Sequence, residues 1–562
     1  MAMKTRIIVL LLTLALLVGM LASCSNGNSP ATTAATTAAT TAATTAGTTA
    51  ATTAATTAVT AAYPIVTDGS VTLDIGTWCH ASTAPYEDLL VFQEYEKISG
   101  VHVNWITFPQ SGFTEKRNIA FATGDLPDAY TKASMSVNDV MKFCTSGAII
   151  SIDEMMPTYA PNLNAYLQAN PNINKGVTML DGHIYGTPYI LESSAIRVQA
   201  RMFFDMELMN TVGGTMPSTT SELVDYLKLV RDQDANGNGD PSDEIPLVTS
   251  GLNHIFQMTA GSFGLNMNGQ SHSFIDMAGG NGFRFLPTTD GYRDQLAFVR
   301  ELYAEKLIDQ EVFTVTSTDA LASISQHQAG AVIWWSVSFI SDPAEYERYE
   351  PLPAMLAGPN GDHAFTCVIG AVNSPAAFII TNKCKIPEIA LRWIDYFYSE
   401  EGIKLYLLGI EGQTYEMGDD GIPFFVDDIM KNPDGLSFQQ AYGRYCPQAG
   451  GSNPTILTEK YYVSGEGLPK SREASNNLKN DMISFDDVWE KFVYSSTEAE
   501  VMSSLEVDIS NYYNEQRALF VSGDLDVTDN ATWEAYCAEY ENLGLEDYLT
   551  MYDIGYKRFA NN

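Results

Sequence analysis

The first stretch of the chain with a regular pattern reads as strand, helix and strand over residues 71–105. Residues 71–78 form a β-type run, and residues 101–105 alternate apolar with polar side chains. Between them, residues 86–99 carry apolar side chains at helical spacing and end at Gly100, which suits the left-handed turn that closes a helix. Two strands joined through a helix pair in parallel, so the pattern predicts an α/β fold. Further helices are predicted over residues 114–122, 220–231 and 387–398, the first of them ended by Gly124 and the last by Gly402. A strand is predicted to start near Ile245.

The length of the folded region predicts two lobes. From about residue 68 to residue 562 the composition is that of a globular protein, with no second apolar run long enough to span a membrane. A region of about 500 residues exceeds what one hydrophobic core usually holds. We therefore expect two packed bodies.

The amino-terminal residues predict export and a lipid anchor. Residues 7–20 are apolar, follow a short positive stretch, and lead into Leu21-Ala22-Ser23-Cys24. That run resembles the bacterial lipobox, so residues 1–23 are predicted to be a lipoprotein signal peptide. Cys24 would become the lipidated amino terminus at the outer face of the cytoplasmic membrane. The alternative is an ordinary secretory signal, cleaved near Ala22, that leaves Cys24 free.

A low-complexity segment separates this signal from the folded region. Residues 30–62 are almost wholly alanine and threonine in an Ala-Thr-Thr-Ala repeat. Such a segment cannot bury a core, so residues 24–67 are predicted to form a disordered tether through a cell wall. A solvated stretch with no particular task predicts the same disorder.

The charge balance excludes several classes of partner. The formal net charge is -37, which argues against nucleic acid and against anionic membrane surfaces. We therefore expect membrane association through the lipid anchor only. Six cysteines follow Cys24 without metal-site spacing, and the sequence does not say whether any are bridged.

Motifs of enzyme active sites are absent from the sequence. The seven histidines show no paired metal-ligand spacing, and neither a Gly-x-Ser-x-Gly elbow nor a phosphate-binding loop occurs. Gly237-Asn238-Gly239 lacks a third glycine and follows a helix, so it is not a dinucleotide loop. Among 68 acidic residues a carboxylate pair could always be proposed, so such a pair carries little weight. These absences favour a protein that is not an enzyme.

Several short motifs occur in order over nearly the whole folded region. They are Thr123-Gly124-Asp125-Leu126-Pro127-Asp128, Asp181-Gly182-His183-Ile184-Tyr185-Gly186-Thr187-Pro188, the loop 234–246, Gly330-Ala331-Val332-Ile333-Trp334-Trp335, Pro387-Glu388-Ile389-Ala390-Leu391, and Gly409-Ile410-Glu411-Gly412 with Tyr415. Together they resemble the family 1 extracellular solute-binding proteins of ABC importers, especially the long lipoproteins of Gram-positive bacteria.

The resemblance implies a two-lobed α/β fold of the periplasmic-binding-protein type, class II and maltose-binding-protein-like. The first lobe would comprise residues 68–190 and 365–440, and the second would comprise residues 191–364 and 441–562. A monomer of this kind closes its lobes on a ligand and delivers it to the permease subunits of an ABC importer.

Aromatic residues at strand ends suggest a carbohydrate ligand. Sugars present apolar C–H faces between hydroxyls, so their sites combine aromatic platforms with planar polar side chains. Trp78 ends the first strand, Tyr130 and Thr131 end another, and Trp334 and Trp335 follow an apolar strand. Because successive strand residues face opposite ways, one of the two adjacent tryptophans is expected in the cleft. Each of these aromatics could instead be a core residue. The resemblance adds four secondary candidates near the cleft, Tyr189, Arg197, Glu411 and Tyr415.

The function that best fits these features is capture of a carbohydrate, in particular an oligosaccharide, for import. Two alternatives stay open at this point. One is a secreted glycan-active hydrolase, which an acidic surface rich in aromatics also suits. The other is a sensing or adhesion protein that binds without transport.

The loop 232–244 is predicted to hold a structural calcium ion. Calcium takes six to eight oxygen ligands, and acidic or amide side chains on alternate residues can turn inward when glycines between them allow a tight coil. Counted from Asp232, the loop has an EF-hand-like register with Gly237 sixth; counted from Asp234, it matches the family pattern. The second register is favoured. Its ligands would be Asp234, Asn236, Asn238, Asp240, Asp243 and Glu244. The alternative is a solvated Asn/Gly turn.

Overall fold

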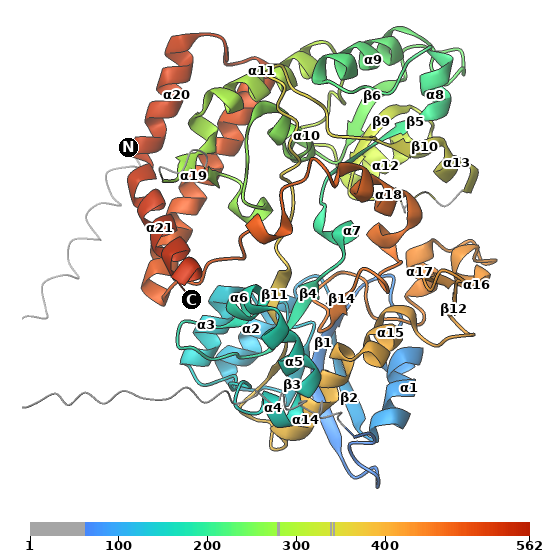
Figure 1. The fold of residues 1–562 in the computed structure, drawn as a ribbon, viewed down its shortest axis with the longest axis vertical. Coiled ribbons are helices and arrows are strands. Elements are labelled where there is room, and N and C mark those ends of the chain that lie inside the picture. Colours follow the sequence, from blue (N-terminus) through green and yellow to red (C-terminus); the bar gives the residue numbers. More distant parts are fainter. Residues whose placement is uncertain (1–61, 278–281, 338–339, 341–342, 562) are drawn as a thin grey trace, which may run out of the picture. The chain divides into compact units, whose positions relative to one another are not determined.

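The structure is a computed structural model that describes residues 62–277, 282–337, 340 and 343–561. The predicted signal peptide, Cys24 and residues 24–61 of the predicted tether lie outside the described residues. Within the described part, the chain forms two main sheets with helices packed on them (Figure 1). The α/β class predicted from the sequence is confirmed.

The first sheet has six strands in the order β14-β4-β11-β3-β1-β2. The strands are β1 (Thr72–Cys79), β2 (His102–Pro109), β3 (Ala129–Thr131), β4 (Thr187–Leu191), β11 (Val372–Ile380) and β14 (Ile456–Leu457). The expected parallel pair is present, with Thr72 opposite His102 and Cys79 opposite Pro109. Strand β11 runs antiparallel to its neighbours β3 and β4 because the chain enters the sheet from the opposite end.

Helices and short turns pack on both faces of the first sheet. They are η1 (Tyr86–Asp88), α1 (Leu90–Ser99), α2 (Phe113–Thr123), α3 (Val137–Thr145), α4 (Met156–Tyr159), α5 (Pro161–Ala169), α6 (Pro171–Val177), α14 (Pro387–Asp395), η5 (Tyr396–Tyr398), α15 (Glu400–Leu408), α16 (Asp427–Met430) and α17 (Phe438–Tyr442). Gly100 and Gly124 close α1 and α2 in the left-handed conformation, as their positions predicted.

Gly402 lies inside a helix and ends none, contrary to the prediction. The chain turns at Ser399, whose hydroxyl accepts a hydrogen bond from the Gly402 amide and so starts α15. A Cβ at Gly402 would lie 1.8 Å from the Tyr396 carbonyl oxygen. This glycine therefore permits a close backbone approach between η5 and α15.

The second sheet has four strands in the order β10-β5-β9-β6. They are β5 (Arg201–Asp205), β6 (Ile245–Thr249), β9 (Ala329–Trp334) and β10 (Tyr349–Pro351). The associated helices are α8 (Met206–Thr211), α9 (Thr220–Asp232), α10 (Leu252–Thr259), α11 (Asp290–Ala304), α12 (Ser317–Ser325), α13 (Pro343–Arg348), α18 (Pro469–Leu478), α19 (Ser496–Ser522), α20 (Asn530–Asn542) and α21 (Leu545–Asn561). One apolar core runs from this sheet to the three carboxy-terminal helices.

One predicted lobe boundary needs correction. The first lobe was expected to end at residue 440, yet β14 pairs with β4 in the first sheet. Tyr442, Cys446 and Tyr462 are buried in the same core as that sheet. Their side chains are apolar or aromatic and lie among the residues of α14 and α15, so the chain returns to the second sheet only after residue 462. The other lobe bounds stay predictions.

The first described residues are docked, although residues 62–67 were predicted to belong to the tether. The Ile65 and Val66 amides donate to the Ser99 carbonyl at 2.7 and 3.2 Å. The Tyr63 ring meets the Tyr396 ring edge-on at 5.1 Å between centroids. The Arg392 guanidinium donates to the Ala62 carbonyl at 2.6 Å. These apolar and aromatic side chains fix the segment against α1 and α14, because burial outweighs the entropy of a free end.

The described cysteines, six in number, are free thiols. No helix among the described residues is both long enough and apolar enough to cross a membrane.

Candidate ligand-binding cavity

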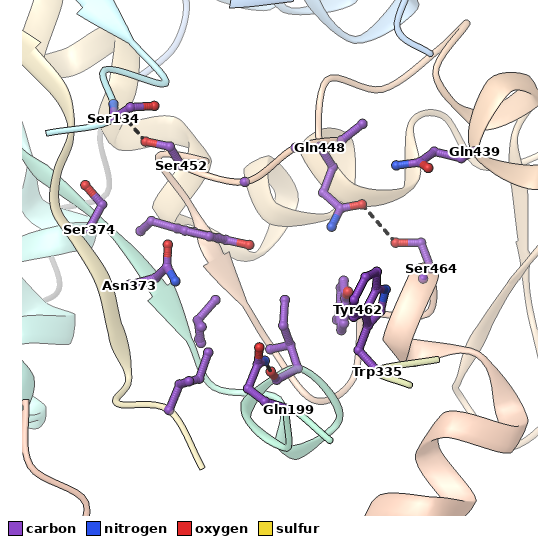
Figure 2. A pocket seen from close by; sticks show the side chains of 18 of the residues that line it. Ser134, Gln199, Trp335, Asn373, Ser374, Gln439, Gln448, Ser452, Tyr462 and Ser464 are labelled. Atoms are coloured by element: carbon purple, nitrogen blue, oxygen red, sulfur yellow. Dashed lines mark hydrogen bonds between the residues drawn. The ribbon is translucent and has the colours of Figure 1, made fainter. Parts of the chain in front are cut away.

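A cavity of about 950 Å³ lies between elements of the two sheets. It is lined from the first-sheet side by residues that follow β3, by β4 and β11, and by the segment from α17 to β14 (Figure 2). From the second-sheet side it is lined by α12, the end of β9 and the chain between α7 (Ser194–Arg197) and β5. The site is thus assembled from chain segments that are far apart in sequence.

Trp335 forms an aromatic platform at the end of β9. Its side chain is 38% exposed, whereas Trp334 is 1% exposed and packs behind it with 4.9 Å between ring centroids. The Trp335 carbonyl accepts a hydrogen bond from the fully buried Arg201. His254 meets the Trp335 ring edge-on at 5.9 Å. These contacts hold Trp335 in place, and its 38% exposure leaves part of the indole accessible to a ligand.

The segment 447–452 forms a wall of the cavity and is held by Lys132. The Lys132 ammonium donates to the carbonyls of Pro447 at 3.0 Å and Ala449 at 2.5 Å. The Ser134 amide donates to the Ser452 hydroxyl at 3.0 Å (Figure 2). Lys132, Ser134 and Ser452 all have positive φ angles, at 48°, 50° and 52°. Non-glycine residues adopt this conformation only where surrounding contacts over-determine it, so this wall is built at a conformational cost.

Burial of Lys132 changes its acid–base behaviour. The side chain is 1% exposed and its ammonium lies 4.2 Å from the centroid of the Trp78 ring. Burial lowers the pKa of Lys132 from 10.5 to about 7, and the nearby Cys79 opposes this shift.

The rest of the lining is rich in neutral hydrogen-bonding groups. Side-chain amides come from Gln199, Asn373, Gln439 and Gln448, which Figure 2 shows around the same space. The Ser464 hydroxyl donates to the Gln448 side-chain oxygen at 3.1 Å and so orients that amide. Amides both donate and accept, which is what a ligand with many hydroxyl groups needs.

Three of the residues predicted to bind ligand line the cavity: Tyr189, Trp334 and Trp335. Trp335 is the more exposed of the two tryptophans, in line with the alternation of strand side chains. Their contact with a ligand stays a prediction.

The other predicted residues do not line this cavity. Trp78 is 3% exposed and donates to the Lys132 carbonyl at 2.8 Å. It is covered by Gly450, where a Cβ would lie 2.5 Å from its ring. Tyr130 and Thr131 are buried in the first-sheet core because β3 is a central strand.

Arg197 faces away from the cavity, and Glu411 and Tyr415 lie outside its lining. The Arg197 guanidinium lies over the Phe485 ring at 3.9 Å and donates to the Ile369 carbonyl at 2.9 Å. Tyr415 starts the short strand β12 (Tyr415–Met417), which pairs with β13 (Pro423–Phe425), and Glu411 bridges to it. Glu411 and Tyr415 are therefore held by local β-type pairing outside the cavity.

The lining residues that sequence reasoning missed lie mainly in irregular segments. Gln439, Gln448, Ser452 and Ser464 occur where the chain has no apolar periodicity. A cluster of glutamine, glycine and serine between residues 437 and 452 was the one available signal, and it also fits an ordinary loop.

The loop between α9 and β6 is a coil whose polar side chains turn inward. Gly237 and Gly239 have φ angles of 72° and 94°, which supply the tight turns. Asn238 donates to an Asp243 carboxylate oxygen at 2.8 Å, and the Ala235 amide donates to Glu244 at 2.8 Å.

Two carboxylate oxygens of this loop are buried without a hydrogen-bond partner, Asp234 Oδ1 and Glu244 Oε2. Asp232 instead pairs with Arg231 at 2.7 Å and its side chain is 59% exposed. This arrangement fits a cation ligated from Asp234 onward better than one ligated from Asp232. Among the described residues no three His, Cys, Asp or Glu side chains form a metal-binding group by themselves. A cation here would therefore need the asparagine and carbonyl oxygens that calcium accepts.

The sequence is similar to known proteins over most of its length. The family model of the bacterial extracellular solute-binding proteins matches residues 80–404. The fructooligosaccharide ABC transporter substrate-binding protein FusA of Streptococcus pneumoniae is 27% identical over 490 residues, which cover 84% of this chain and 87% of FusA. The polygalacturonan/rhamnogalacturonan-binding protein YtcQ of Bacillus subtilis is 24% identical over 341 residues, which cover 58% of this chain and 64% of YtcQ.

Solved structures show the same fold. FusA in complex with kestose superposes with a TM-score of 0.71 at 25% identity, covering 87% of this chain and all of FusA. An EF-hand mutant of FusA in complex with fructo-nystose superposes equally well, at 24% identity.

Proposed function

Because the chain belongs to the bacterial extracellular solute-binding proteins, we propose that it captures an oligosaccharide in the 950 Å³ cavity and delivers it to an ABC importer. The observation that carries this proposal is the half-exposed Trp335 platform facing a ring of amide and hydroxyl side chains. An indole face and amide groups match the apolar faces and the hydroxyl groups of a sugar. FusA, a relative over most of the chain, is a fructooligosaccharide-binding protein.

The size of the cavity supports an oligosaccharide over a single sugar. Small-molecule sites range from about 300 to 1,000 Å³, so a cavity of about 950 Å³ offers room for several rings. Trp335, Tyr189 and the four amide side chains would be the main ligand contacts. The two sheets would belong to two lobes of a monomer that close on the ligand, and the permease subunits of the importer would receive it.

The alternative function, a glycan-active hydrolase, is less favoured. Hydrolysis of glycosidic bonds ordinarily uses two carboxyl groups on either side of the bond. The described residues that line the cavity include no aspartate and no glutamate. Binding without transport, as in a sensor or an adhesin, needs the same cavity and is separated from import only by an uptake assay.

The attachment to the membrane rests on Cys24. Its lipobox-like setting supports a lipid anchor on the outer face of the cytoplasmic membrane, with the Ala/Thr-rich segment as tether.

Calcium would have a structural role in the loop 234–244. The buried, unpartnered oxygens of Asp234 and Glu244 support this, since buried carboxylate oxygens need a compensating partner. The existence of an EF-hand mutant of FusA is a further, weaker support.

Calorimetric titration with a panel of oligosaccharides tests the function. We expect at least one of them to bind and to be recovered unchanged. Release of new reducing ends would favour the hydrolase instead. Binding of peptides or amino acids, with no response to any glycan, would overturn the proposal.

A further inference from the structure

The cavity lining is almost free of charge although the chain is strongly acidic. Charged residues make up 18% of the sequence, with 68 acidic and 31 basic side chains. Among the described residues that line the cavity, Lys491 is the one charged residue. Its side chain is exposed, and it also lines a smaller adjoining cavity of about 350 Å³ next to α19. The inner surface is therefore a neutral patch in an acidic molecule.

Two further cations near the cavity are buried behind its walls. Lys132 is 1% exposed, and its ammonium donates to the carbonyls of Pro447 and Ala449 behind the wall. Arg201 is likewise fully buried, where it donates to the Trp335 and Ala195 carbonyls and to the Ser475 hydroxyl. These two cations shape the walls through backbone carbonyls, so the exposed Lys491 is the one cation among the described lining residues that an anion could meet.

Burying a charged ligand group in such a cavity is unfavourable. A carboxylate that loses its water without gaining a cationic partner pays a large desolvation cost. The net charge of -37 adds a long-range repulsion of anions, reduced by salt. A cationic or zwitterionic ligand would find no carboxylate among the described lining residues. Hydroxyl groups, in contrast, can be paired by Gln199, Asn373, Gln439 and Gln448.

We propose that the cavity selects uncharged oligosaccharides and rejects uronic-acid oligomers of the same length. This selectivity rests on the proposed carbohydrate-binding function and narrows it. The relatives include proteins named for both kinds of ligand, since fructooligosaccharides are neutral and polygalacturonan is acidic. The nearly uncharged cavity lining groups this chain with the relative that is named for neutral sugars.

Titration of the full chain with two matched sets of sugars tests the selectivity. One set holds neutral fructo-, gluco- and galacto-oligosaccharides of three to five rings, and the other holds oligogalacturonates of equal length. At physiological salt we expect a neutral sugar to bind and every oligogalacturonate to bind at least roughly a hundredfold more weakly. An oligogalacturonate that binds as tightly as the best neutral sugar would overturn the selectivity while leaving the carbohydrate function intact. Failure of every sugar in both sets would overturn both.

A charge pair at one lining position gives a second test. Gln439 is an exposed residue of α17 that lines the cavity. Gln439→Lys and Gln439→Glu are matched in size and differ in sign. We expect oligogalacturonate affinity to be roughly fivefold or more higher in the lysine variant than in the glutamate variant, and the difference to shrink in 1 M salt. Equal affinities for the two variants would show that ligand charge is not sensed at this wall and would count against the proposal.

Discussion

Replacing Lys132 by methionine should change how stability depends on pH. The side chain is 1% exposed, and its ammonium has two carbonyl acceptors and no ion-pair partner among the described residues. Burial lowers its pKa from 10.5 to about 7. Methionine has a similar length and carries neither the charge nor the two donors.

The direction in which stability changes with pH follows from the number of protons that the folded and unfolded states bind. Above the folded-state pKa the folded protein has released the Lys132 proton, whereas the unfolded chain keeps it up to about pH 10.5. The unfolded state therefore binds more protons, and stability rises with pH in this window. At 1.36 kcal/mol per pH unit, the increase between pH 6 and pH 9 is about 3 kcal/mol. The penalty for the buried charge is fully present below pH 6.

Denaturant unfolding of the wild type and of Lys132→Met at several pH values measures this contribution of Lys132 to the pH dependence of stability. The difference in unfolding free energy between the two proteins should grow by about 3 kcal/mol in favour of the wild type from pH 6 to pH 9. Lys97→Met is the control, since that side chain is 71% exposed, and its curve should run parallel to the wild type. Parallel curves for Lys132→Met as well would refute the reasoning. Because Lys132 holds the wall segment 447–452, the variant should also bind oligosaccharide more weakly.

Three further predictions concern the cavity, the calcium loop and the anchor. Trp335→Ala should weaken oligosaccharide binding roughly tenfold or more with little loss of stability. Trp334→Ala, at a 1% exposed position, should instead lower the free energy of unfolding by about 3–5 kcal/mol. Calorimetry measures the binding and denaturant unfolding measures the stability, and equal effects of the two variants would contradict the assignment of Trp335 as the ligand platform and of Trp334 as its buried support. Chelation should lower the melting temperature of the wild type, and calcium should restore it more than magnesium does. The melting temperature of the double variant Asp234→Asn with Glu244→Gln should not change on chelation. A wild-type melting temperature that does not change on chelation would exclude the calcium site in the loop. Cys24→Ser should leave the fold unchanged and move the protein from the membrane fraction to the medium, and retention in the membrane would exclude the lipid anchor.

The sequence predicted those parts of the fold that local pattern determines. The parallel pair β1–β2, the caps at Gly100 and Gly124, helix α9 and strand β6 all follow from apolar spacing and turn residues. The return of β14 to the first sheet could not be read in this way. A two-residue strand has no periodicity, and its pairing with β4 depends on contacts far apart in the chain.

The difference between local pattern and long-range contacts also explains which site residues could be predicted from the sequence. Trp334 and Trp335 come at the end of a clear apolar strand, so the sequence predicted one of the two at the cavity without deciding which. Trp78 follows an equally clear strand, and it is buried because the segment around Gly450 folds over it. That covering segment also carries Gln448 and Ser452, whose glutamine, glycine and serine surroundings fit an ordinary loop equally well. Position along a strand therefore predicted nearness to the ligand side, and tertiary covering decided exposure.

The docking of residues 62–66 on α1 and α14 has a mechanical consequence. Any pull on the amino-terminal segment enters the molecule at Ser99, Arg392 and Tyr396, all on the helices of the first sheet. If Cys24 carries the proposed anchor, the first-sheet half would be the part held at the membrane and the second-sheet half would be the part free to move. Closure on a ligand would then move Trp335 toward the wall formed by residues 447–452, and tension on the tether would act on the first-sheet half alone.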